Sequence, residues 1–360
     1  MAGRNMDIVK STAIQILRKL RAQDIFSVVA FSDRAEVILP AFRTSELVKL
    51  EARIQMLQTS GGTEIYQGLE AGFNEVNRNA DKAHVNHIIL LTDGRTYGDE
   101  SACMELAQKA ANRGIGISGL GIGNEWNDVF LDELASCTGG SSMYVSRPDD
   151  IQRLLLEKFN HLWQVYAEDT SLSFEPLSGI VLRIAFRLQP EAGLLSLESP
   201  IRPGVIPRDQ SIKILMEFFV KPECCQGNQV DLMKGELNLQ ISTLPVPPPM
   251  VNLHLTRPIT TMSGSEPPPQ EIIDAVSQLT LYRLQERARF EVSSGDYKQA
   301  SVHLQLLATH LLSQGKKQLA QTALLEAEHI LKNQAFSKEG DKRIKYGTRS
   351  LLIPNQEKKA

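Results

Sequence analysis

The chain has 360 residues, more than one ordinary hydrophobic core accommodates, and this length predicts two or three domains. Hydrophobic residues make up 42% of it and charged residues 22%, a balance typical of globular proteins. The formal net charge of −3 argues against a nucleic-acid partner, and the lack of a long apolar run argues against a membrane span.

The cysteines are few and match no zinc or redox spacing: Cys103, Cys137, Cys224 and Cys225. A disulfide framework is not expected in so long a chain, so we interpret them as free thiols in a reducing compartment. The N-terminus has no signal-peptide pattern. A cytoplasmic location is therefore predicted, on the condition that no longer N-terminus carries a signal.

Residues 1–166 alternate between helical and strand patterns. Apolar side chains recur at helical spacing from Met6 to Leu20, and the apolar run 25–31 predicts a strand buried on both faces. Further strands are expected at 35–39, 87–91, 115–120 and 142–145, and helices at 45–57, 64–77, 100–112, 128–137 and 149–166. This alternation predicts a doubly wound α/β domain with a parallel sheet.

The pattern changes after residue 168. Strand-like runs separated by Pro and Gly turns predict an antiparallel β-sandwich over 168–258, with strands at 179–188, 211–220, 236–241 and 251–255. A Pro-rich linker is expected at 259–270.

The C-terminal part is predicted to be helical. Turns at 294–296 and 313–315 divide residues 271–334 into three helices of a small helical domain. Residues 335–360 are polar and basic, and we expect them to form a solvated tail.

Two short segments carry the residues best suited to a functional site. The loop 59–65 reads Thr-Ser-Gly-Gly-Thr-Glu-Ile, and 90–94 reads Leu-Leu-Thr-Asp-Gly at the end of a predicted buried strand. Ligands of open α/β sheets bind beyond the carboxyl ends of the strands, where both segments belong. Thr63 offers a hydroxyl oxygen and Asp93 a carboxylate, which suit Mg²⁺, Mn²⁺ or Ca²⁺.

On these motifs residues 1–165 resemble the von Willebrand factor A (VWA) family, and the segments 121–124 and 134–140 are similar to its fifth strand and last helix. In this family a metal-ion-dependent adhesion site takes ligands from three loops. They carry an Asp-x-Ser-x-Ser motif, a Thr matched here by Thr63, and an Asp matched here by Asp93. The resemblance implies that Mg²⁺ or Mn²⁺ keeps one coordination position open for an Asp or Glu side chain of a protein partner.

The chain departs from the family pattern at its start. No Asp-x-Ser-x-Ser precedes the first helix, and Met1 to Met6 look like the residues just after that motif. The resemblance therefore implies a VWA-type sheet without its central first strand, which would leave the strands at 25–31 and 87–92 without a shared neighbour. Two explanations compete: a longer gene product that starts upstream, or a degenerate domain in which metal binding is weak or lost.

Both site residues also have simpler interpretations. Thr63 could cap the helix that follows it, and Asp93 could cap a turn before Gly94. The segment 114–119 matches Gly-x-Gly-x-x-Gly formally, but it runs through a predicted strand instead of joining a strand to a helix. A metal site at three C-terminal histidines is less favoured than a structural role: His303, His310 and His329.

The function predicted from the sequence is a non-catalytic protein–protein interaction module of the VWA type. Motifs for a nucleophile elbow, a phosphate-binding loop and a zinc protease are absent, so no enzyme is predicted. The alternative is a regulatory or assembly subunit of an ATPase- or chelatase-like complex. No nucleic acid and no membrane are expected among the partners.

Overall fold

The computed structural model describes residues 1, 3–43, 47–58, 61–81, 84–241, 244, 248, 250–260 and 267–351. The chain divides into two compact units, one of them Met1–Ile212 with Met216–Ile259 and the other Lys213–Leu215 with Thr260–Ala360. In the described part of the chain, no helix has the length and apolar character needed to cross a membrane.

A parallel sheet lies in the first unit and is built from β3 (Asn86–Thr92), β4 (Ile115–Ile122) and β5 (Ser142–Val145) in that order. Strand β4 is almost wholly buried because it has a neighbour on each edge and helices on both faces. Helix α4 (Glu100–Ala111) connects β3 to β4, and helix α5 (Asp128–Thr138) connects β4 to β5. Each of these crossovers returns the chain to the same end of the sheet, so the three strands run parallel.

A second, antiparallel pair stands apart from this sheet. Strand β1 (Ile25–Phe31) pairs with β2 (Ala35–Arg43), and among the described residues neither strand is hydrogen bonded to β3. The prediction that residues 25–31 are buried on both faces is therefore wrong. They are mostly half-buried although helices cover both faces, because among the described residues one edge of β1 has no strand beside it. The parallel pattern holds for β3, β4 and β5.

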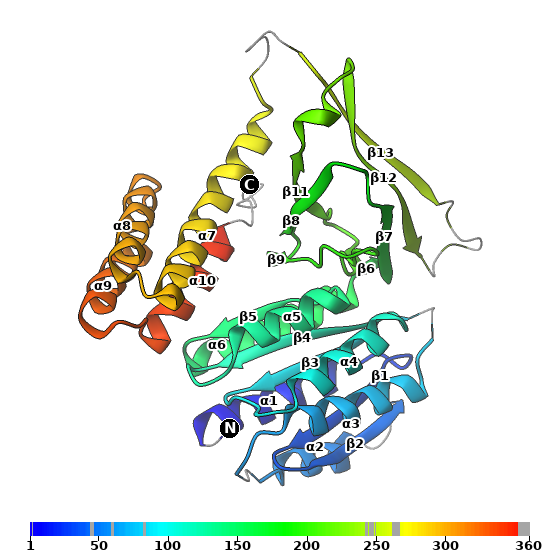
Figure 1. Cartoon of the computed structure of the whole chain (residues 1–360). Helices are drawn as coiled ribbons and strands as arrows, with labels where there is room; N and C mark the ends of the chain where they lie inside the picture. Colours follow the sequence, from blue (N-terminus) through cyan, green and yellow to red (C-terminus); the bar gives the residue numbers. More distant parts are fainter. Residues whose placement is uncertain are drawn as a thin grey trace, which may run out of the picture. The chain divides into compact units, whose positions relative to one another are not determined.

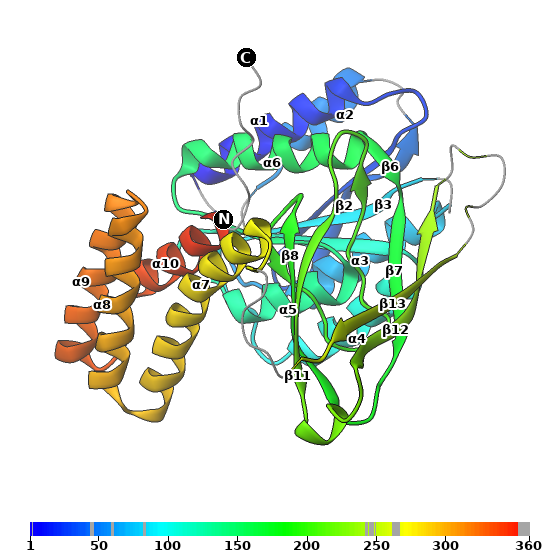
Figure 2. The same ribbon diagram turned by 90° about the horizontal axis from the view of Figure 1, so that it is seen from above.

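Helices cover both faces of these strands (Figures 1 and 2). Helices α6 (Pro148–Trp163), α1 (Arg4–Lys19) and α2 (Leu47–Gln55) lie on one face, and α5, α4 and α3 (Ile65–Arg78) on the other. Apolar side chains of α1 and α6 pack against β4 and β5 to form one core: Ile16, Leu120, Ile122, Val145, Ile151 and Leu155. This α/β arrangement is the fold class expected from the alternating pattern.

Further strands follow α6, and most of them lie in the first unit; β12 pairs antiparallel with β13 and β7, β8 with β9, and β6 with β10. One sheet has the order β13-β12-β7 and another the order β11-β8-β9, while β6 pairs with β10. The bounds are β6 Val165–Ala167, β7 Asp169–Glu175, β8 Ile180–Gln189, β9 Gly193–Leu194, β10 Ile206–Pro207, β11 Lys213–Val220, β12 Gln229–Gln240 and β13 Val251–Pro258. Of the predicted linker 259–270, residues 261–266 lie outside the described part, and residue 270 already begins a helix.

The second unit consists of the helices α7 (Gln270–Ser294), α8 (Tyr297–Ser313), α9 (Lys317–Asn333) and α10 (Lys338–Leu351). The turns at Gly295 and Gly315 separate the first three helices as predicted, and both glycines have positive φ. Leucines and alanines of α7, α8 and α9 form the shared core, which Ile344 of α10 completes.

The expectation of a solvated tail over 335–360 is wrong for residues 338–351, which form α10. The side chain of Asp341 accepts two hydrogen bonds from Arg289 of α7, at 2.7 and 2.6 Å. Ser337, just before α10, donates its hydroxyl to Glu326 of α9 at 2.6 Å. These polar contacts hold α10 against α7 and α9. A basic composition was therefore not a sign that this segment is exposed. Residues 352–360 lie outside the described part.

Candidate functional site

Thr63 and Asp93 lie on loops that meet at the carboxyl end of β3. Asp93 directly follows this strand, and Thr63 lies two positions before Ile65, the first residue of α3. The two loops touch, because a Cβ added to Gly94 would lie 2.7 Å from the Thr63 hydroxyl oxygen. Glycine at position 94 thus permits the close approach of this hydroxyl to the residue that follows Asp93.

A third loop, between β1 and β2, joins the same edge. The backbone N–H of Glu64 donates to the carbonyl of Ser32 at 2.7 Å. The carboxylate of Asp33 lies against Gly62, which has a φ of +89° and no side chain to obstruct it. Sequence reasoning did not single out Asp33, since nothing local in its turn indicates which loop it faces.

Two further residues hold the loops of Thr63 and Asp93 together. The backbone N–H of Ile65 donates to the Thr96 hydroxyl at 3.1 Å, and that of Tyr66 donates to Asp99 Oδ2 at 2.8 Å. The hydroxyl of Thr96 in turn donates to the other carboxylate oxygen of Asp99. The first amides of α3 are therefore capped by the loop that follows Asp93.

This capping decides one open alternative. The N-cap residue of α3 is Glu64, which makes no side-chain cap, and the cap comes from Thr96 and Asp99 instead. Thr63 is therefore not the helix cap, and its hydroxyl is left for another role. The turn at Gly94 is likewise bonded by Thr92, whose hydroxyl oxygen accepts from the Gly94 N–H at 3.3 Å.

The carboxylate of Asp93 is partly exposed, at 32% of its side-chain surface, and lies 3.0 Å from the terminal amine of Met1. Its oxygens and the Thr63 hydroxyl are hard donors of the kind that Mg²⁺ and Mn²⁺ prefer. Among the described residues, no three or more His, Cys, Asp or Glu side chains are grouped to hold a metal ion. Thr63 and Asp93 fit the chemistry of a divalent ion but fill about two of its roughly six positions.

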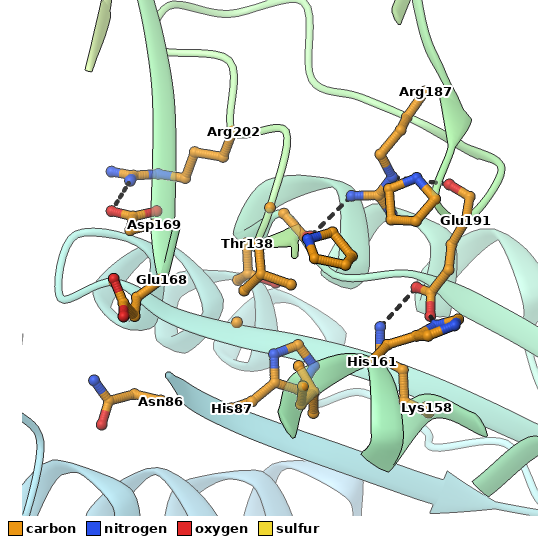
Figure 3. Close-up of a pocket in the computed structure, with 18 of the residues that line it drawn as sticks. Asn86, His87, Thr138, Lys158, His161, Glu168, Asp169, Arg187, Glu191 and Arg202 are labelled. Carbon is orange, nitrogen blue, oxygen red and sulfur yellow. Dashed lines mark hydrogen bonds and ion pairs between the residues drawn. The ribbon is translucent and has the colours of Figure 1, made fainter. Parts of the chain in front are cut away.

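A polar cluster lies at the opposite end of the parallel strands, where the α/β part meets the later strands (Figure 3). The ammonium of Lys158 on α6 donates to Glu191 Oε2 at 2.7 Å and to the Ser141 hydroxyl at 3.1 Å. His161 Nδ1 lies 3.2 Å from the other oxygen of the same carboxylate. The nearby positive charges hold the pKa of Glu191 well below its usual range despite its burial.

Arg187 of β8 fastens the two parts of the first unit to each other. Its guanidinium donates to the carbonyls of Gly139 at 3.0 Å and Gly140 at 2.6 Å in the α/β part. It also donates to the carbonyl of Pro203 at 2.6 Å and to that of Glu191 at 2.8 Å. Because Lys158, Glu191 and Arg187 all have hydrogen-bond partners, this cluster is a structural junction.

His87 at the start of β3 belongs to the same junction. Its Nε2 lies 2.9 Å from the Ser118 hydroxyl, whose oxygen also accepts from the Ser141 N–H at 3.1 Å. Burial lowers the pKa of His87 to about 3, with help from the charge on Lys158. The imidazole is therefore neutral at physiological pH.

The weaker sequence signals do not form sites. The Gly-x-Gly-x-x-Gly match at 114–119 runs into β4, as its context predicted. The four cysteines are free thiols, and burial raises the pKa of Cys103 to about 12, which makes it unreactive. Within the described ranges, no metal-binding group includes the histidines of α8 and α9.

Comparison with known proteins identifies the class. Residues 1–158 match the family model of the von Willebrand factor type A domain. The chain contains this domain, and its second unit, over residues 270–354, matches the family described as "Sll0103-like, C-terminal alpha-helical domain".

Particular relatives agree with this assignment. The chain is 26% identical over 326 residues to "Uncharacterized protein sll0103" of Synechocystis, covering 86% of this chain and 75% of that protein. It is 22% identical to the Escherichia coli protein YfbK over 49% of this chain and 31% of the relative. A solved von Willebrand factor type A protein from Catenulispora acidiphila superposes with a TM-score of 0.75 at 14% identity, covering 95% of this chain and 84% of that one. At this identity the likeness shows the fold.

Proposed function

We propose that the protein is a non-catalytic binding module that contacts a protein partner through the loop edge around Thr63 and Asp93. Von Willebrand factor type A domains are commonly protein-interaction modules. A divalent ion held by these two side chains would offer an open position to an Asp or Glu of the partner.

The observation that carries the proposal is the convergence of three loops on one edge. Thr63 lies against Gly94, Asp33 lies against Gly62, and the capping of α3 by Thr96 and Asp99 fixes the spacing. This fixed arrangement leaves the carboxylate of Asp93 partly exposed to an incoming group. Binding residues are typically presented in this way, on loops held by a rigid scaffold.

Electron paramagnetic resonance of Mn²⁺ tests whether these two side chains bind a metal. With two protein ligands, we expect weak binding, with a dissociation constant on the order of 10⁻³ M. Asp93→Asn and Thr63→Val should weaken it, while Asp209→Asn, which changes an exposed carboxylate outside this edge, should not. Equal binding by all four proteins would contradict a metal site at this pair.

A role as a regulatory or assembly subunit of an ATPase-like complex stays a prediction, without a structural observation that favours it. A protein-binding edge is compatible with such a complex but does not specify one.

A further inference from the structure

We propose that Arg95 and Tyr97 are the residues by which this edge selects its partner, and that the partner segment presents a carboxylate and an apolar side chain two residues apart. The proposal depends on the function proposed above, because it takes the loop edge as the binding surface. It adds the chemistry of the partner and names residues outside the metal-ligand pair.

The loop that carries Arg95 and Tyr97 is held from within. The Thr96 side chain between them is buried, 3% exposed, and bonded to both Asp99 and the Ile65 N–H. The N–H of Gly98 donates to Glu100 Oε2 at 2.9 Å. A loop fixed on both sides of Tyr97 loses little conformational freedom when a partner binds, which favours affinity.

Successive side chains of this loop point inward and outward. Thr96 is buried, whereas its neighbours Arg95 and Tyr97 are exposed. Tyr97 is 84% exposed, the highest value among the large apolar side chains in the described part of the chain. Tyr and Arg are enriched among the residues that dominate binding energy at protein interfaces. This pair therefore has the composition of an interaction hot spot beside Asp93.

The chemistry of the two side chains defines the partner. Among the described residues, Arg95 has no hydrogen bond or ion pair, so its guanidinium is available for a planar, two-bond contact with a carboxylate. The ring of Tyr97 can cover an apolar side chain while its hydroxyl stays in water.

Spacing and charge restrict the partner further. Side chains two residues apart in an extended segment lie about 7 Å from each other, so a partner strand with the same i, i+2 spacing matches Arg95 and Tyr97. Asp33 lies on the same edge and would repel a densely acidic segment. The inferred partner thus has an isolated Asp or Glu and an apolar residue that lie two positions apart in its sequence.

Ligand-observed NMR on the full chain tests the assignment with the peptide acetyl-Gly-Asp-Gly-Phe-Gly-amide, measured in Mg²⁺ and in EDTA. We expect saturation transfer to the Phe ring, and weaker transfer for peptides with Asn in place of Asp or Gly in place of Phe. Arg95→Ala and Tyr97→Ala should each lower the affinity by about fivefold or more. Because both side chains are exposed, neither change should alter folding.

Matched controls are Arg53→Ala and Tyr166→Ala, which remove an exposed residue of the same type outside this loop and should leave binding unchanged. Binding that depends on Asp93 but not on Arg95 or Tyr97 would overturn this inference and leave the proposed function standing. Binding that is unchanged by substitution of Asp93, Arg95 or Tyr97 would overturn both this inference and the proposed function. Absence of peptide binding to the unaltered protein, or equal losses in the control variants, would also overturn the inference.

Discussion

Arg187 shows how one buried side chain can join two parts of a unit. It is 3% exposed and donates to four backbone carbonyls, of which Gly139 and Gly140 belong to the α/β part. The αL conformation of Gly139 at the end of α5 turns its carbonyl toward this guanidinium. A buried carbonyl that loses such a donor destabilises the fold, because its lost hydration is no longer replaced by a hydrogen bond.

Replacing Arg187 with Met should therefore lower the free energy of unfolding by about 3 kcal/mol, because several buried carbonyls lose their partner. Urea denaturation followed by tryptophan fluorescence measures this. Arg183→Met is the matched control, since Arg183 lies on the same strand, is exposed and stacks over Phe219. A loss for Arg187→Met no larger than for the control would contradict the role as a fastener.

His87 makes stability depend on pH. Its pKa is about 3 in the folded state and about 6.5 when unfolded, so between these values the unfolded chain binds a proton that the folded chain does not. Stability from this residue is complete above pH 6.5 and falls by about 1.4 kcal/mol per unit as pH drops below it. His87→Gln should flatten the decline between pH 6.5 and 5. If the free energy of unfolding of both proteins declined equally with falling pH, His87 would not be held neutral in the folded state.

At the scale of elements, the separation of β1 from β3 has a measurable consequence. Strand β3 is hydrogen bonded to β4 on one edge, and in the described ranges no strand pairs with its other edge. Amide protons of a strand point alternately to its two edges. Strand β4, between β3 and β5, has a partner on each edge over residues 119–121.

Amide hydrogen exchange should therefore alternate between slow and fast along β3 and be uniformly slow over residues 119–121 of β4, because unpaired amides exchange readily. The internal comparison between the two strands is the control. Uniform, strong protection of every β3 amide would mean that its second edge is paired in solution.

Elements differed in how well the sequence predicted them, for physical reasons. Strand β5 occupies 142–145 as predicted, because a short apolar run between turns has few alternatives. Strand β7 was missed because only two of its residues, Leu172 and Phe174, are apolar, which is too few to give a clear alternating pattern. Helix α10 was missed because its buried positions include charged residues: Lys342, Lys345 and Arg349. Their burial depends on tertiary partners that periodicity does not reveal.

The sequence predicted that Thr63 and Asp93 lie at the same edge of the sheet, but not how their loops are held there. Thr63 and Asp93 do lie on touching loops at the carboxyl end of β3. The residues that hold them there, Thr96 and Asp99, act across more than thirty positions of sequence, as the separations of 31 and 33 to their partners show. A hydroxyl and a carboxylate three residues apart, as in Thr96 and Asp99, are a signal for capping of the helix that follows, which here is α4. The structure shows that they cap α3 instead.

At the scale of the whole molecule, the division into two units predicts two unfolding transitions. The α/β part and most of the later strands share the junction of Lys158, Arg187 and Glu191, whereas the helices have a core of their own. Domains with separate cores can unfold independently.

Both tryptophans, Trp126 and Trp163, lie in the first unit, so tryptophan fluorescence should follow its unfolding in a single step. Circular dichroism at 222 nm also includes the helices of the second unit and should show a second midpoint. Arg289→Ala, which breaks the contact to Asp341, should move the circular dichroism midpoint and not the fluorescence midpoint. A single transition with the same midpoint by fluorescence and circular dichroism, which Arg289→Ala shifts equally for both, would contradict independent unfolding of the two units.

Backbone chemical-shift mapping of the full chain with the Asp-Gly-Phe peptide in Mg²⁺ tests whether the partner binds at the loop edge around Thr63 and Asp93. We predict shift changes concentrated at residues 61–65 and 93–99 that disappear in Asp93→Asn and persist in Asp209→Asn. Shift changes confined to the opposite end of the strands, near His87 and Glu191, would show that the peptide binds elsewhere. Shift changes that Asp93→Asn leaves unaltered would show that binding does not depend on this edge.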